Sequence, residues 1–328
     1  MTTNTGTAPA AKRVEKKRHG VIYDVLSRMI REKPLATFGL AVIVVLLIIG
    51  IFASFLAPYG MNEIHLLDRL QAPSSHYLLG TDELGRDILS RLIYGARISM
   101  IIGLSATALS TVLSVFIGGI SAYIGGRLDL IVQRFIDVWM AIPSFLILMT
   151  IMSMVNNKSG SVWPIIVVLG VTTGIGGSRF MRSAVISIKS NMYVSATEAI
   201  GCGPVRTMLR HIVPNIMAPI IVSFTIGVGG AIMAEASLSY LGLGVPPNVP
   251  SWGSMISLEG QKYFQQTPQL ALWPGFALSI VVFGINMFGD GLRDLLDPRL
   301  RGGVGRYSMK GSTLEKLKAR VDKYDRDH

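Results

Sequence analysis

The stretch YVSATEAIGCGPVRTMLRHIVPN, residues 193–215, separates two long apolar runs with glycine, proline and basic residues. A helix needs about 20 consecutive apolar residues to cross about 30 Å of bilayer hydrocarbon, where the backbone finds no water to bond. The runs on both sides of the stretch have about this length. The stretch therefore indicates a surface connection between two membrane-spanning helices.

The composition of the whole chain agrees with a membrane protein. Of its 328 residues, 50% are hydrophobic and 16% are charged, and the mean hydropathy is +0.49. A soluble domain carries about 25% charged residues. We therefore expect an all-α, polytopic membrane protein with six transmembrane helices. Their charge-free windows are residues 35–60, 98–126, 138–157, 159–178, 212–234 and 263–289.

The first window follows basic residues, as a secretory signal does, but it is too long for one and ends without an A-x-A-like cleavage site. We expect it to remain in the protein. Cys202 is the single cysteine, so no intrachain disulfide forms.

The basic residues predict the orientation of the chain. With the N-terminus inside, 25 of the 31 Lys and Arg residues lie on the cytoplasmic side and six lie outside. The positive-inside rule then places both termini in the cytoplasm. The net charge of +11 is explained by this topology and by contact with anionic membrane lipid, so nucleic acid is not expected as a partner.

The same features predict four regions. Residues 1–34 form a cytoplasmic tail with an amphipathic helix over 21–31, and residues 35–97 hold the first transmembrane helix and an extracytoplasmic segment. The remaining regions are a core of five transmembrane helices, 98–290, with a cytoplasmic loop 185–215 and an extracytoplasmic segment 238–262, and a cytoplasmic tail, 291–328.

Two outer segments are candidates for the mouth of a pathway. Over 80–97 we expect a short helix capped by Thr81, with Asp82 and Glu83 in its first turn, although a solvated charged helix is an equal alternative. In the second segment, glycines and prolines between 242 and 250 exclude a continuous helix. Its apolar residues need cover from protein or a water-filled vestibule. Within the spans, Pro143 predicts a kink and the glycines predict close helix packing.

The opening stretch predicts two helices that meet at a corner. Residues 193–200 suit a short helix that Gly201 ends. From Val205 to Val213 apolar residues recur at helical spacing, with Arg206 and Arg210 on the opposite face. The residues alone leave two interpretations open: a hairpin on the inner leaflet, or a docking knob with small side chains at its tip.

The stretch also resembles the cytoplasmic EAA loop of ATP-binding-cassette (ABC) importer permeases, which has an E-A-A-x-x-x-G core, then a basic residue and a P-N pair. The matching residues are Gly201, Arg210, His211, Pro214 and Asn215. Ser195 stands in place of the family's Glu and Thr197 in place of its second Ala, and Glu198 is the carboxylate three positions downstream.

Three more motifs resemble the C-type subunit of the dipeptide, oligopeptide and nickel subfamily: GTDELGRDILSRLIYGARIS (80–99), SLSYLGLGVPPNVPSWGSM (237–255) and GDGLRDLLDPRLR (289–301). The chain departs from relatives at Gly174 and Gly177, where Trp and Tyr are common. The resemblance implies a type I ABC importer permease fold in a bacterial or archaeal plasma (inner) membrane.

The resemblance also implies partners: a homologous B-type permease, two ABC ATPase subunits that bind ATP and Mg, and an extracytoplasmic solute-binding protein. The sequence contains no Gly-Lys dipeptide, hence no Walker phosphate loop, and its five histidines lack metal-ligand spacing. We therefore expect a non-catalytic subunit with no cofactor or metal of its own.

Two sets of site residues follow. The expected ATPase-coupling residues are Ser195, Ala196, Thr197, Glu198, Ala199, Gly201, Arg206, Arg210 and Pro214. The expected residues of the extracytoplasmic gate are Asp82, Arg86, Asp87, Glu235, Leu238, Leu241 and Trp252.

Other functions are weighed against this one. A secondary transporter or channel usually has carboxylates or histidines near the bilayer midplane, and the windows contain none there. A structural anchor does not explain the apolar outer segment. Peptides are the substrate class that the resemblance implies, with nickel, glutathione or oligosaccharide as alternatives.

Overall fold

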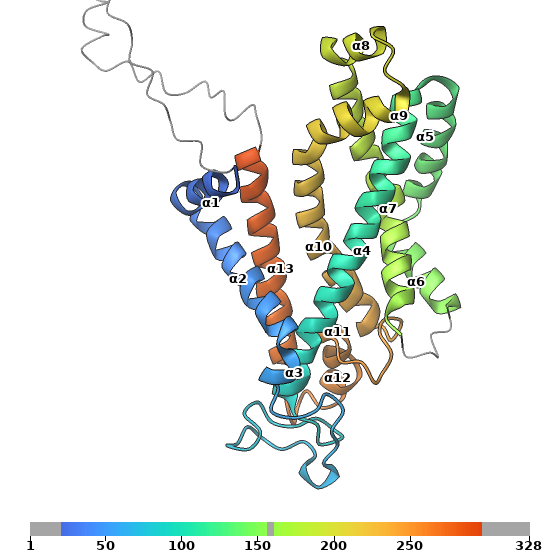
Figure 1. Cartoon of the computed structure of the whole chain (residues 1–328). Helices are drawn as coiled ribbons and strands as arrows, with labels where there is room; N and C mark the ends of the chain where they lie inside the picture. Colours follow the sequence, from blue (N-terminus) through green and yellow to red (C-terminus); the bar gives the residue numbers. More distant parts are fainter. Residues whose placement is uncertain (1–20, 156–160, 297–328) are drawn as a thin grey trace, which may run out of the picture.

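The structure is a computed structural model that describes residues 21–155 and 161–296. Within these ranges the regular structure is helical, apart from one isolated bridge between Thr81 and Asp87. Figure 1 shows an elongated bundle of long helices that run between its two ends. Five segments are long and apolar enough to cross a bilayer: α2 (Pro34–Ile51), α4 (Ile88–Ile124), α7 (Trp163–Lys189), the helical segment Pro204–Tyr240, and α13 (Gln269–Leu296).

Two further helices, taken together, are long and apolar enough for one more span, but they meet at a sharp bend. The axes of α5 (Gly126–Ala141) and α6 (Ser144–Met154) differ by 84°. Between them Ile142 and Pro143 are extended, because proline lacks an N–H and disfavours helical geometry in the residue before it. The kink expected at Pro143 is confirmed, whereas the helix before it begins at Gly126, ahead of the predicted window 138–157.

Helix α4 is the longest helix described. Its 37 residues correspond to about 55 Å at about 1.5 Å per residue, well beyond the hydrocarbon thickness. It begins at Ile88, where Asp87 accepts a hydrogen bond from the Ser90 amide, so the predicted N-cap Thr81 is wrong. Asp82 instead folds its carboxylate back onto the amides of Leu84 and Arg86, a local bond that competes with helix formation.

Small residues allow the long helices to pack closely. Helix α4 packs most extensively against α7, where a methyl group on Gly118 would lie 2.0 Å from the Ser178 carbonyl oxygen. Between α2 and α13, a methyl group on Gly39 would lie 2.2 Å from the Gly284 carbonyl oxygen. Such close contacts stabilise helix pairs in a bilayer, because an apolar side chain gains little free energy when it exchanges lipid for protein contacts. The expected packing role of glycine is confirmed at Gly118.

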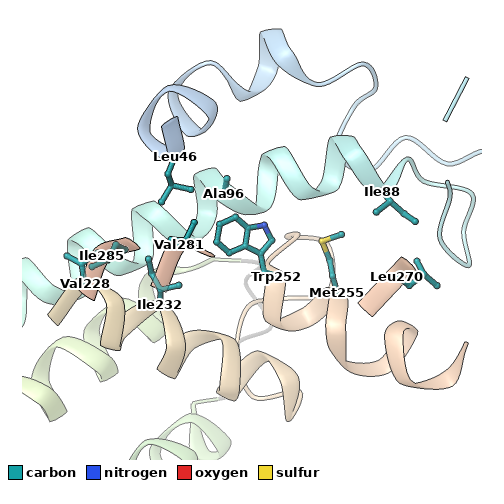
Figure 2. Close-up of a cluster of buried hydrophobic side chains, with 10 residues drawn as sticks. All are labelled: Leu46, Ile88, Ala96, Val228, Ile232, Trp252, Met255, Leu270, Val281 and Ile285. Atoms are coloured by element: carbon teal, nitrogen blue, oxygen red, sulfur yellow. The ribbon is translucent and has the colours of Figure 1, made fainter. Parts of the chain in front are cut away.

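The largest buried cluster joins α2, α4, the C-terminal half of α10 (Met217–Tyr240) and α13. Figure 2 shows Trp252 of the short α11 (Trp252–Ser254) at its centre, near Ala96 and Val281. A smaller cluster contains Met29 of α1 (Val21–Glu32), while Arg28 and Arg31 of the same helix are exposed.

The bundle has two distinct ends (Figure 1). At one, here called the hairpin end, lie the start of α2, the end of α13, α8 (Met192–Ala199) and α9 (Pro204–Thr207). At the other, the loop end, lie α11, α12 (Gly260–Lys262) and residues 57–87. Lys33 and Asp294 pair at 2.5 Å and join α2 to α13 at the hairpin end. The remaining short elements are α3 (Ala53–Leu56), η1 (Leu66–Asp68), η2 (Met208–Ile212), η3 (Val213–Ile216) and η4 (Met255–Glu259).

Candidate functional site

Helices α8 and α9 form a compact hairpin, as the sequence predicts. The amide of Cys202 donates to the Thr197 carbonyl at 3.0 Å, and Gly201 between them has φ +82°, so α8 ends in a Schellman turn. Pro204 then occupies the first turn of α9, where its missing N–H costs no helical bond. The corner is therefore fixed by backbone geometry.

The hairpin is anchored to three long helices. Val194 of α8 is buried against Ala122 of α4, Val185 of α7 and Ile212, which leads into α10. The Lys189 ammonium donates to the Tyr123 carbonyl at 2.5 Å and joins α7 to α4 beside this cluster. A displacement of α8 would therefore be carried into α4, α7 and α10.

The tip of the hairpin presents small side chains. Ser195, Ala196 and Ala199 are exposed, whereas Thr197 is half-buried and its hydroxyl donates to the Val194 carbonyl at 2.7 Å. The side chain of Glu198 lies outside the described part of the structure, so its proposed replacement of the family's Glu stays a prediction.

Two arginines flank the tip. Arg206 and Arg210 lie one turn apart, and both are exposed, as is Pro214. Neither arginine pairs with an acidic residue within the described ranges. Their positive charge faces outward from the hairpin end.

The apolar face predicted for the second helix is only partly buried. Ile212 is buried, but Val205 and Leu209 are 70% and 65% exposed and line a groove of about 710 Å³ beside α4. The helix takes a π-helical turn over Met208–Ile212, which adds a residue per turn and rotates the face that a spacing of 3.6 residues predicts. The apolar residues at this spacing are therefore divided between the buried Ile212 and the exposed Val205 and Leu209.

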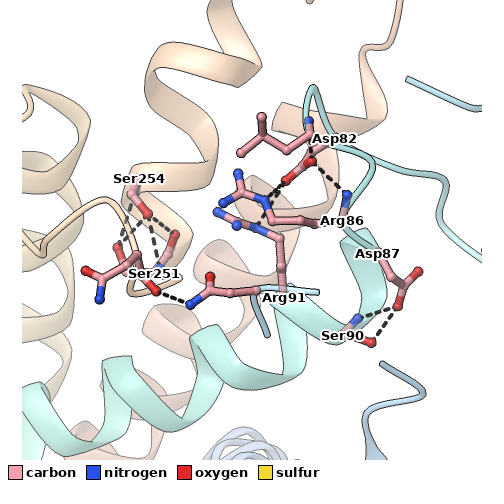
Figure 3. A network of polar contacts seen from close by, with 10 residues as sticks. Asp82, Arg86, Asp87, Ser90, Arg91, Ser251 and Ser254 are labelled. Carbon is pink, nitrogen blue, oxygen red and sulfur yellow. Dashed lines mark hydrogen bonds and ion pairs between the residues drawn. The ribbon is translucent and has the colours of Figure 1, made fainter. Parts of the chain in front are cut away.

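At the loop end, the predicted gate carboxylates are buried in ion pairs and caps (Figure 3). The Arg86 and Arg91 Nε atoms lie 2.6 and 3.5 Å from Oδ2 of Asp82, and all three side chains are at least 94% buried. Asp87 is also buried and accepts from the Ser90 hydroxyl at 2.6 Å. In this conformation these groups hold the loop 57–87 onto α4, and none of them faces an open space.

The other predicted gate residues are also buried, with one exception. Glu235, Leu238 and Trp252 are buried, and the Trp252 indole N–H donates to the Leu92 carbonyl at 3.1 Å. Leu241 is 48% exposed, the one exposed member of the seven predicted residues, all of which are described.

The structure adds a face of α10 that the sequence did not reveal. Met233, Ser237 and Tyr240 lie beside Leu241 around a hollow of about 360 Å³, with Phe145 of α6 on its other side. Their spacing follows one helical face, but α10 is mostly apolar on every side, so its sequence does not distinguish the exposed face from the buried one. Within the described residues no cluster of His, Cys, Asp or Glu could hold a metal ion.

Known proteins resemble this chain along most of its length. Residues 110–302 match the family described as binding-protein-dependent transport system inner membrane component, and residues 24–73 match the N-terminal TM domain of oligopeptide transport permease C. The chain is 40% identical to the oligopeptide transport system permease protein OppC of Bacillus subtilis over 291 residues, 89% of this chain and 94% of the relative. It is 37% identical to the dipeptide transport system permease protein DppC of Alkalihalophilus pseudofirmus, over 84% of this chain and 89% of the relative.

A solved structure shows the same fold. A chain of the MetNI methionine ABC transporter, in inward-facing conformations, superimposes with a TM-score of 0.52 at 17% identity, covering 64% of this chain and 98% of that chain. Five apolar helices and one bent pair agree with a protein that crosses the membrane several times. The chain therefore belongs to the family of inner membrane components of binding-protein-dependent transport systems, as a multi-pass permease subunit of the ABC importer type.

Proposed function

We propose that this chain forms half of the translocation pathway for peptides, and that its hairpin couples the pathway to a separate ATPase. The similar proteins OppC and DppC, named for oligopeptide and dipeptide transport, support the substrate class. Nickel, glutathione and oligosaccharide are the alternatives to be excluded by uptake assays. Family membership sets aside the alternative of a secondary transporter or channel.

The proposal includes four partners. A homologous B-type permease completes the pathway, two ABC ATPase subunits supply energy with ATP and Mg, and an extracytoplasmic binding protein delivers the solute. The family description names dependence on a binding protein, which supports that partner. The hairpin end is the cytoplasmic side, which agrees with the position of both described chain ends there (Figure 1).

One observation carries the coupling role. The tip residues Ser195, Ala196 and Ala199 are small and exposed, yet Val194 on the same short helix is buried against α4, α7 and the start of the α10 span. A small-residue tip fits a groove in a partner, and a buried base transmits force. Met192 and Ile200 beside this tip are also exposed, so a hairpin lying on the inner leaflet is the alternative that cross-linking to the ATPase tests.

The mechanism is rigid-body alternating access. When ATP binding draws the ATPases together, the hairpin moves with the ATPase that holds it, and the packed helices α4, α7 and α10 move with the hairpin. The pathway then changes from inward-facing to outward-facing. A docking contact must therefore differ between the two states, since only differential binding shifts their populations.

Site-specific cross-linking tests this proposal. In a Cys202→Ser background, Ala196→Cys should cross-link to a co-purified ATPase, whereas Leu67→Cys, fully exposed at the loop end, should not. Ala196→Asp should separate ATP hydrolysis from uptake, because it places a charge in the contact. An unreactive Ala196→Cys in an assembled, active complex, or normal uptake by Ala196→Asp, contradicts the coupling role.

A further inference from the structure

The last turns of α10 contain a carboxyl group in an unusual environment. Glu235 is fully buried at the loop end, and its Oε1 accepts a hydrogen bond from the Ser239 hydroxyl at 2.6 Å. Its Oε2 has no hydrogen-bond partner in the described part of the chain, and the Ser251 side chain lies near the carboxyl group. Burying a carboxyl group costs free energy unless hydrogen bonds compensate for the lost water, so the contacts of Glu235 are important for the fold here.

The two hydroxyl groups belong to opposite ends of one loop. Ser239 precedes loop 241–250, and its hydroxyl also accepts from the Val245 amide at 3.2 Å. Ser251 follows the loop and caps α11 by accepting from the Ser254 amide at 3.2 Å (Figure 3). Glu235 thus lies where the beginning and the end of the loop meet α10.

Close backbone packing holds the same parts together. A methyl group on Gly253 would lie 2.3 Å from the Ala236 carbonyl oxygen, and one on Gly244 would lie 1.9 Å from the Ser239 hydroxyl. Trp252, between these contacts, bonds to the Leu92 carbonyl of α4. The loop is therefore fitted between α10 and α4.

The position of this loop determines which side chains line the hollow beside α10. Leu241 is the first residue of the loop, and with Tyr240 it lines the hollow on the face of α10 opposite Glu235. If the loop detaches from α10, Leu241 loses its defined place there.

We propose that Glu235 is a positioning residue that, through Ser239 and Ser251, holds loop 241–250 and α11 to α10, so that this outer segment moves with α10 as one body when the pathway opens. The proposal rests on the proposed function, since it concerns the pathway of an importer. It assigns Glu235 a holding role in place of the lining role that the sequence suggested.

The test uses the assembled transporter in lipid, in a Cys202→Ser background. A spin label at position 241 reports the motion of the loop, and a label at the exposed Met192 of α8 is the reference. Glu235→Ala and Ser251→Ala should increase the mobility of the label at 241 and leave the reference unchanged. Glu235→Gln, which can still accept from Ser239, should preserve the wild-type spectrum.

A matched control and a functional readout accompany the labels. Ser237→Ala removes another hydroxyl from α10. Among the described contacts, this hydroxyl donates only to the Met233 carbonyl one turn earlier, at 2.9 Å, so the variant should change neither spectrum. Uptake by Glu235→Ala should fall about tenfold, equivalent to about 1.4 kcal/mol, and Glu235→Gln should restore it.

Two results would overturn the proposal: an unchanged label at 241 in Ser251→Ala and in Glu235→Ala, or Glu235→Gln matching Glu235→Ala in mobility and uptake. If Glu235→Ala does not assemble, Ser251→Ala and Glu235→Gln decide the question. Cross-linking at Ala196 distinguishes this failure from that of the coupling role, because the two readouts lie at opposite ends of the bundle.

Discussion

The Arg182 guanidinium of α7 binds the Asp129 carboxylate of α5 with two hydrogen bonds, Nε to Oδ1 at 2.8 Å and Nη2 to Oδ2 at 2.6 Å. The Ser121 hydroxyl of α4 donates to the same carboxylate at 2.5 Å. Three helices therefore meet at one ion pair, close to the base of the hairpin. Such two-point pairing fixes orientation as well as distance.

Breaking this pair should destabilise the protein. Asp129→Asn removes the charge that Arg182 needs and should lower the free energy of unfolding by about 1–3 kcal/mol. The measurement is thermal unfolding of the purified complex in detergent. Arg134→Gln is the control, because Arg134 pairs with Asp137 at an 82% exposed position and exposed pairs contribute about 0–1 kcal/mol. Equal effects of the two variants would show that the Asp129 pair has no special weight.

The Gly201 turn should be needed for coupling. Gly201 has φ +82°, so Gly201→Ala strains the backbone by about 1–2 kcal/mol and should shift the tip of the hairpin. Uptake per ATP hydrolysed should fall. Gly203→Ala is a matched control two residues away, since Gly203 has φ −66° and open space around it. A Gly201→Ala transporter with wild-type coupling would remove the need for this turn.

Asp82 should be essential for the loop end. Asp82→Asn removes the buried carboxylate charge that the Arg86 and Arg91 cations contact, and loss of one partner of a buried ion pair costs about 3–5 kcal/mol. Assembly yield and thermal unfolding would show the loss. Glu83→Gln is the neighbouring control, because the Glu83 pair with Lys262 is exposed. If Asp82→Asn is as stable as Glu83→Gln, the buried pairs are not what holds the loop.

Trp252 should stabilise the fold through its packing and through one hydrogen bond, and two substitutions can separate these contributions. Trp252→Ala should cost about 3–5 kcal/mol, as for other buried Trp side chains. Trp252→Phe keeps much of the volume and should cost about 1 kcal/mol for the bond to Leu92. Trp273→Ala, at a 40% exposed site, should have a smaller effect in the same unfolding assay. Similar losses for Trp252→Ala and Trp273→Ala would contradict the central place of Trp252.

Alkaline pH should loosen the loop 57–87 through Tyr77. Burial and the hydrogen bond to Asp68 raise the pKa of Tyr77 from 10.0 to about 12. Because the unfolded loop loses this proton at lower pH than the folded loop, the stabilisation is complete below pH 10 and disappears as pH rises to about 12.

Limited proteolysis of the loop against pH would measure this loss. Tyr77→Phe should remove the dependence over that range, while Tyr240→Phe, at a half-exposed site on α10, should retain it. A pH dependence that persists in Tyr77→Phe would assign the effect to another group.

The windows of the sequence located the spans but not their ends. Charge-free length identified the region of every span, because hydrocarbon excludes unpaired charge over that distance. The starts of α4, α5 and α7 lie elsewhere than the windows suggest, since helix ends depend on local bonds such as the Asp87 cap. Within the site, the corner at Gly201 was predictable because a glycine in left-handed geometry is a local property.

The sequence by itself therefore determined the class of the molecule, the apolar regions that can cross a membrane and the hairpin with its exposed arginines, because these depend on composition and on neighbours within a few residues. The tertiary structure decided which polar residues are buried. Asp82 and Glu235 looked like residues of an open mouth and are instead enclosed, because burial depends on helices distant in the chain. The same packing left Met233 and Tyr240 exposed on a span whose two faces are alike in sequence.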